Sequence, residues 1–97
     1  IEDCDCAMRC YDTAMSGEIM PGTIVFLKKI AVEAIIPGGT YVIGSQNYIL
    51  LRKVHPAAEA GERVLTLKAA NAGYDSVRIA VDDVECVYRV VAQLRLC

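Results

Sequence analysis

The chain has 97 residues, the size of one domain, and 55% of them are apolar, which is enough for a hydrophobic core. Its 10 basic and 12 acidic residues leave a net charge of −2, so this segment is not expected to carry the clustered Lys and Arg of a nucleic-acid-binding surface. No apolar run reaches the roughly 20 residues that cross a bilayer, and no signal peptide is visible, so a membrane location is not expected.

Alternating apolar residues predict a first strand near the start of the chain. In residues 4–10 every second side chain is apolar, which places four of them on one face of a strand, expected in the core: Cys4, Cys6, Met8 and Cys10. Residues 14–19 are compatible with a short helical turn, and Met-Pro-Gly at 20–22 indicates a tight turn. Residues 23–30 then read as a strand.

The middle of the chain predicts a hairpin. Pro-Gly-Gly at 37–39 interrupts the chain, and residues 40–45 and 47–55 follow as two strands joined by a turn around Gln46. The polar stretch from 56 to 62, which contains Pro, Ala and Gly, is predicted to be a loop.

Three further segments predict that strands continue to the end of the chain. Residues 63–69 and 77–81 alternate, and between them residues 70–75 form a loop in which Gly73 is expected to adopt a positive φ. Residues 84–96 predict a long last strand whose second face still carries Val87 and Val91. A strand that is apolar on part of both faces needs cover on both, from this chain or from a partner.

This pattern predicts a mainly β fold with at most a short helical turn, in one domain spanning residues 1–97. The cysteines do not suggest a metal site, because Cys-x-Cys-x3-Cys is not a usual zinc spacing and no second Cys or His pair follows. We interpret them as core thiols, reduced in a cytoplasm, with a metal or a disulfide as alternatives. His55 precedes Pro56, where a surface turn is favoured over a general base.

Several stretches, taken in order, resemble one known family. "AMRCYDTAMSGEIMPGTIV", residues 7–25, is similar without a gap to a family pattern of the form "ALRVKGDSMEPTIxxGDIV". "YVIGSQNYILLRKV" is similar to "YVI…LLVKRL", "LKAANAGYDSVRIAV" loosely to "LxSDNPAYPPIxV" and "VECVYRVV" to "VxxIGRVV". The chain therefore resembles the C-terminal domain of LexA and the phage repressors, self-cleaving peptidases with a Ser–Lys dyad. The resemblance implies a β-ribbon or partly open antiparallel barrel, as in signal peptidases, that dimerises.

The catalytic positions implied by this resemblance do not carry the family's chemistry. The nucleophilic serine falls on Ala14, which has no hydroxyl, and the lysine falls on Arg52. A Ser–Lys pair needs a lysine that loses its proton on desolvation, whereas arginine stays charged at any working pH. The resemblance thus implies a vestigial cleft, lined by Met15, Gly22 and Arg52, in a protein that is not an enzyme and needs no cofactor or metal.

Two alternatives remain open. A shifted pair, Thr13 or Ser16 with Lys53, would make an active peptidase, although strand neighbours point to opposite faces and disfavour it. A peptide- or protein-sensing module could instead use the old cleft, with Arg52 holding a carboxylate.

The expected function is that of the dimerisation and regulatory domain of a cytoplasmic, phage-repressor-like transcription factor. Because the chain begins at Ile1 rather than at Met, we expect it to be a fragment or a processed product. A DNA-binding domain would precede it and make the only contact with DNA. A homodimer is expected, with Val87 and Val91 on the last strand as its contact.

Overall fold

The computed structural model describes residues 4–95, which contain seven strands and two short 3₁₀ helices. The strands are β1 (Cys6–Cys10), β2 (Thr23–Ile30), β3 (Thr40–Ser45), β4 (Ile49–Glu59), β5 (Glu62–Lys68), β6 (Val77–Ala80) and β7 (Val84–Leu94). The 3₁₀ helices are η1 (Val32–Ala34) and η2 (Val81–Asp83). The prediction of a mainly β fold is confirmed, and neither of these short helices is long enough to cross a bilayer.

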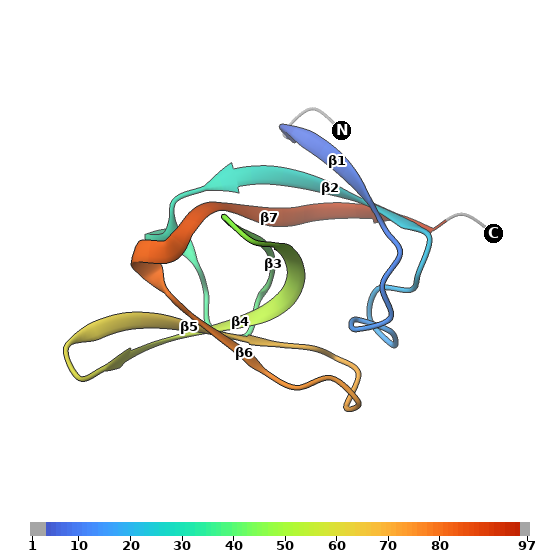
Figure 1. Ribbon diagram of the computed structural model, residues 1–97. Helices are drawn as coiled ribbons and strands as arrows, with labels where there is room; N and C mark the ends of the chain where they lie inside the picture. The colour runs from blue at the N-terminus through green and yellow to red at the C-terminus, as the bar shows by residue number, and fades with distance from the viewer. Residues whose placement is uncertain (1–3, 96–97) are drawn as a thin grey trace.

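The strands form one antiparallel sheet in the order β1-β2-β7-β3-β4-β5-β6. The sheet curls into an open half-barrel, with β7 passing over β3 and β4 (Figure 1). The last strand, β7, thus lies inside the sheet between β2 and β3, where it connects the β1–β2 pair to strands β3 to β6.

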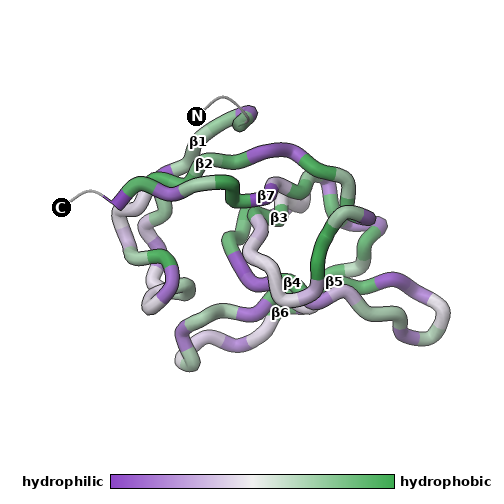
Figure 2. The backbone as a smooth tube through the Cα atoms, turned by 180° about the vertical axis from the view of Figure 1, so that it is seen from behind, coloured by the Kyte–Doolittle hydropathy of each residue, from purple (hydrophilic) through white to green (hydrophobic). Residues whose placement is uncertain are grey.

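Two clusters of buried side chains hold the curled sheet together. The first joins β3, β4, β5, β6 and β7 with the segment before β3: Ile35, Tyr41, Ile43, Val54, Leu65, Leu67, Ile79 and Val87. The second joins β1, β2, β3 and β4 with the β1–β2 loop: Cys10, Met15, Ile19, Val25, Leu27, Val42 and Leu51. Figure 2 shows the hydrophobic stretches of β2, β7 and β3 next to one another. Burial of these side chains supplies most of the drive to fold.

The prediction that the sulfur-rich face of β1 lies in the core is only half right. Cys10 is buried and Met8 packs against the second cluster, but Cys6 is exposed. The reason is that β1 is an edge strand, so only its later half is covered by the β1–β2 loop and its neighbours. Cys6, Cys10 and Cys86 are free thiols.

The predicted loop at 56–62 is wrong, because β4 continues through Pro56 to Glu59. Beyond Lys53, β5 is the only described strand that pairs with β4, so the other edge of β4 is open there. An open edge tolerates proline, because the N–H that proline lacks would not have formed a hydrogen bond within the sheet. The hairpin turns instead at Ala60 and Gly61, with φ of 51° and 82°. The positive φ predicted for Gly73 is also wrong, since Gly73 is not among the described residues with positive φ.

The prediction that Val87 forms a dimer contact is wrong. Val87 is 2% exposed and belongs to the first core cluster, so this chain already covers that face of β7. Val91 is half-buried and lies at a bulge, where β7 has one more residue than β2 between the pairs Val90–Leu27 and Ala92–Phe26.

Candidate functional site

The position matched to the family's nucleophile lies in the loop between β1 and β2. Thr13 to Ile19 form hydrogen-bonded turns, with bonds from Ser16 N to Thr13 O (3.1 Å) and from Ile19 N to Met15 O (2.8 Å). Asp12 caps the start of these turns, because its Oδ1 accepts a hydrogen bond from Ala14 N at 2.9 Å. The prediction of a helical turn at 14–19 is only partly right, because Gly17 has a φ of 102° and no helix forms there. Ala14 is completely buried.

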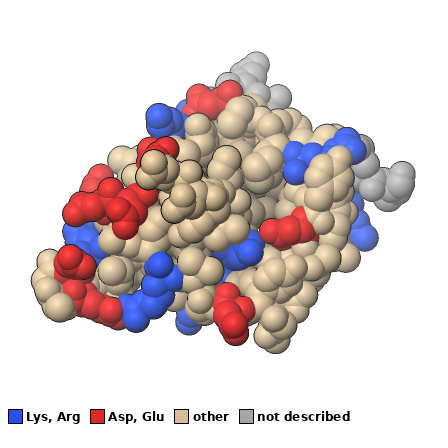
Figure 3. All heavy atoms as spheres, viewed as in Figure 1, with Lys and Arg blue, Asp and Glu red and all other residues tan. Residues whose placement is uncertain are grey.

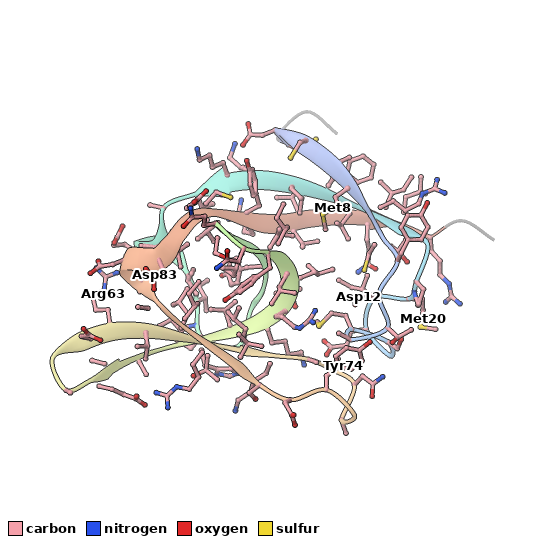
Figure 4. The ribbon with its side chains drawn as sticks, in the orientation of Figure 1. Met8, Asp12, Met20, Arg63, Tyr74 and Asp83 are labelled. Atoms are coloured by element: carbon pink, nitrogen blue, oxygen red, sulfur yellow. The ribbon has the colours of Figure 1, made fainter. Side chains whose placement is uncertain are left out.

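The loop between β5 and β6 is tied to the same spot. Asn71 donates from its backbone N to Ala14 O (2.8 Å) and from Nδ2 to Thr13 O (3.2 Å). The hydroxyls of Thr13 and Tyr74 lie 2.7 Å apart in a hydrogen bond. Figure 4 shows Tyr74 from this loop beneath Asp12, at the end of the molecule where the β1–β2 loop hangs from the sheet.

Arg52 on β4 completes the cluster. Its Nη1 donates to Leu51 O at 2.8 Å and to Asp12 Oδ2 at 3.3 Å, and its guanidinium carbon lies 5.7 Å from the centre of the Tyr74 ring. Asp12 thus binds both the backbone of Ala14 and the side chain of Arg52. The carboxylate of Asp12 therefore connects Ala14 and Arg52, the two positions matched to the family's dyad, although they lie on different elements. We call Asp12, Thr13, Ala14, Arg52, Asn71 and Tyr74 the Asp12 cluster.

The prediction that Met15 and Arg52 line a vestigial cleft is not supported by their burial. Ala14 and Met15 are 0% exposed, Arg52 is 6% exposed, and Met15 belongs to the second core cluster. Gly22 has a structural role instead. Its φ of 90° suits glycine, and its N–H donates to Cys10 O at 2.6 Å, which closes the β1–β2 loop.

Among the described residues, no hydrogen bond joins Lys53 to the hydroxyl of Thr13 or of Ser16, the alternative pair. The Thr13 hydroxyl bonds to Tyr74, and the Lys53 ammonium lies 2.6 Å from a carboxylate oxygen of Glu18. The side chain of Lys53 is 36% exposed and that of Arg52 only 7%, in keeping with neighbours that point to opposite faces of a strand.

One ionisable group near the cluster has a shifted titration. Burial raises the pKa of the Cys10 thiol, and the negative charge of Asp12 raises it further. A thiol of this kind is a poor nucleophile, because the thiolate is the reactive form. Cys10 therefore acts as an apolar core residue next to the Asp12 cluster.

Sequence reasoning did not identify Asp12 as a member of this site. Asn71 and Tyr74 lie within a stretch that carries the motif resemblance. Their side-chain hydrogen bonds to Thr13 could not be predicted, because they join residues 58 and 61 positions apart in the sequence.

Among residues 4–95, no three His, Cys, Asp or Glu side chains are arranged to hold a metal ion. Figure 3 shows acidic and basic side chains interspersed on one face of the molecule, with the acidic ones gathered at the end that carries η2 and the β4–β5 turn.

Comparison with protein-family models gives no match for this chain, and a search of curated proteins gives no significant match. Its function therefore has to be inferred from its own geometry and from the motif resemblance.

Proposed function

We propose that the chain is the non-catalytic dimerisation and regulatory domain of a phage-repressor-like transcription regulator that works in the cytoplasm. A DNA-binding domain would be supplied by a further part of the same protein. The observation that carries this proposal is the Asp12 cluster. Two positions picked out by the motif resemblance, Ala14 and Arg52, meet through one side chain, and neither has the chemistry for peptide hydrolysis.

The chemistry of the cluster supports a structural use of the former catalytic positions. Alanine has no group that can attack a carbonyl carbon, and a guanidinium paired with a carboxylate cannot take up a proton. Arg52, with Asp12 and Tyr74, instead ties three parts of the fold together: the β1–β2 loop, β4 and the β5–β6 loop. The burial of Ala14 and Arg52 supports a role in stabilising the scaffold.

Dimerisation gives such a scaffold a use in transcription. Two DNA-binding domains held about a two-fold axis read two half-sites together, and tethering raises the effective concentration of the second domain at its half-site. Apolar side chains suited to such a contact lie at the end of the sheet where β2 begins: Tyr11, Met20 and Leu94 are 71%, 37% and 48% exposed. We call these three residues the end patch.

A fusion experiment tests the proposal. The chain is joined to a DNA-binding domain that binds its operator only as a dimer, and repression of a reporter is measured in bacteria. We expect repression to depend on the fused chain. A folded, well-expressed fusion that represses no better than the DNA-binding domain alone contradicts the proposal.

The peptidase alternative has its own test. Self-cleavage of the chain, or of the longer protein that contains it, is followed by mass spectrometry at pH 9 to 10, where lysine begins to lose its proton. We expect no cleavage. Cleavage that disappears in Thr13→Ala, Ser16→Ala or Lys53→Ala would establish the shifted pair and overturn the non-catalytic proposal.

The cluster does not favour a peptide-sensing role for Arg52. Its guanidinium already has Asp12, Leu51 O and the Tyr74 ring as partners, and only 6% of the residue is exposed. A peptide carboxylate would have to displace Asp12 to reach it. If this role were real, Arg52→Ala would weaken peptide binding; we expect no carboxylate-dependent binding at this position.

A further inference from the structure

Part of one edge of β7 is not paired with any strand within residues 4–95. β7 pairs with β2 from Val87 to Leu94, but its pairing with β3 ends at the pair Tyr41–Arg89. From Val90 to Leu94, therefore, no described strand pairs with the β3 side of β7, and the β7 ribbon continues past β3 in Figure 1. An unpaired strand edge presents backbone N–H and C=O groups to any extended chain that reaches it.

A groove of about 630 Å³ lies beside this edge. Arg89, Val90 and Gln93 of β7 form one wall, and the chain leading into β3, from Gly39 to Tyr41, forms the other. Glu18, Ile19 and Ile36 complete the lining. The volume is in the range of sites that hold small ligands or short peptides, and none of its lining residues belongs to the Asp12 cluster.

The groove combines apolar surface with a positive charge that has no partner. Ile36 is 70% exposed, a high value for an isoleucine beside a core tyrosine. Its backbone N–H donates a hydrogen bond to the hydroxyl oxygen of Tyr41 at 2.9 Å, which fixes the position of Ile36. Arg89 is exposed and stands opposite Lys28 on β2. No ion pair to a described residue is found for either, and like charges directly opposite across strands are unfavourable.

The acidic group in the lining does not neutralise Arg89. Glu18 is paired with Lys53, at 2.6 Å between Oε2 and Nζ. The groove therefore favours an occupant that carries its own carboxylate, placed where it can meet Arg89 and Lys28.

From these observations we infer that the groove is a binding site for an extended, acidic peptide segment of another protein. The segment adds as a strand to β7 between Val90 and Leu94, in line with β3. It would pair over about five residues, at roughly 3.3 Å per residue. Backbone hydrogen bonds to β7 give it register, an apolar side chain covers Ile36 and Val90, and an acidic side chain binds Arg89. The lining of the groove shares no residue with the Asp12 cluster or with the end patch, although the strand edge itself reaches the end patch at Leu94.

The inference is tested by selection from a phage-displayed library of random heptapeptides on the intact chain. We expect enriched peptides to combine an acidic residue with alternating apolar residues. Affinity of a synthetic enriched peptide, measured by fluorescence anisotropy, should fall about tenfold or more in Arg89→Glu and in Ile36→Asp. Two matched controls lie away from the groove, Arg63→Glu and Ile49→Asp, and should bind as the unchanged chain does.

Backbone pairing is tested separately on the peptide. N-methylation of the amides that face β7 removes donors and should abolish binding, whereas N-methylation of the alternate amides should leave it intact. Failure to enrich any peptide, or peptides that bind equally well to Arg89→Glu and Ile36→Asp, would overturn the inference. Self-association that is lost in Arg89→Glu would also overturn it, because a second copy would then occupy the groove.

Discussion

Arg52 is a buried charge that holds three parts of the fold together. Its side chain is 7% exposed, and it reaches two oxygen acceptors and the face of an aromatic ring. Hydrogen bonds to charged groups contribute more to stability than neutral ones, and the buried stem of arginine adds packing. These contacts join Arg52 to Asp12, 40 residues earlier in the chain, and to Tyr74 in the loop between β5 and β6.

Arg52→Ala is expected to destabilise the fold by roughly 1–3 kcal/mol, because it removes these bonds and shortens a buried side chain. The free energy of unfolding in urea measures the change. Arg63→Ala is the matched control, since Arg63 pairs with Glu33 on the surface, where both side chains are more than half exposed. Equal behaviour of the two variants would show that the Asp12 cluster contributes no special stability.

Cys10 provides a pH-dependent test at the same scale. Burial and the charge of Asp12 raise the pKa of its thiol in the folded chain. An unfolded cysteine ionises near pH 8.5, so above about pH 8.5 the unfolded chain releases a proton that the folded chain keeps. The stability due to the neutral thiol is fully present below that pH and is lost as the pH rises through the folded pKa.

We therefore expect the unchanged chain to lose more stability than Cys10→Ala between pH 7 and pH 9.5, as measured by urea unfolding at each pH. The comparison is made between pH slopes, because the alanine variant is also destabilised at every pH by the smaller side chain. The same burial predicts that iodoacetamide modifies the exposed Cys6 before Cys10. Identical slopes in the two proteins would rule out Cys10 as the titrating group.

At the residue scale, the sequence predicted the positions of the site residues better than it predicted their roles. Ala14 and Arg52 were identified because short motifs keep their order and spacing along the chain. The roles of Asp12 and Tyr74 could not be predicted, because they depend on side chains brought together from three separate elements. For the same reason Met15 was assigned to a cleft, although it lies at the centre of a core cluster.

Among the elements, the β4–β5 hairpin carries a local strain that the sequence pattern did not predict. Glu59 pairs with Glu62, so Ala60 and Gly61 are the two turn residues, and both have positive φ. This is the pattern of a type I′ turn, which favours Asn followed by Gly. Alanine at a positive φ is unfavourable, since its Cβ approaches the backbone.

Ala60→Asn is expected to stabilise the chain by about 0.5–1 kcal/mol, because asparagine adopts this conformation more readily than alanine. Thermal unfolding measures the gain. Ala58→Asn is the control, because Ala58 lies within β4, is exposed and pairs with Arg63, where asparagine has no such advantage. A loss of stability in Ala60→Asn would mean that the turn does not have this conformation.

The strands differ in how well their sequence predicts them. The bounds of β2 and β3 coincide with the predicted 23–30 and 40–45, because the turn residues Gly22 and Gly39 directly precede the two segments. β4 was predicted too short because a proline usually ends a strand, and whether it does depends on which edge is open in the assembled sheet. The face of β7 was misjudged for a similar reason. Its central place in the sheet, between β2 and β3, buries Val87 under segments distant in sequence.

For the whole molecule, the end patch is the surface on which the proposed dimer depends. Leu94 pairs with Ile24 on β2, Tyr11 follows Cys10, which pairs with Thr23, and Met20 O accepts a hydrogen bond from Thr23 N. These pairings gather Tyr11, Met20 and Leu94 around the start of β2. Exposed apolar side chains that gather in this way mark a protein–protein contact more often than isolated ones do.

Leu94→Asp is therefore expected to separate the dimer into monomers, because a two-fold contact would bring the new carboxylates of both copies into an apolar interface. Sedimentation equilibrium at tens of micromolar protein measures the change. Ile49→Asp is the matched control, since Ile49 is 66% exposed on β4, away from the end patch, and its variant should remain dimeric. A monomeric unchanged chain would refute the dimer itself. A dimeric Leu94→Asp variant would refute only the assignment of its contact, because the fusion reporter responds to dimerisation through any surface.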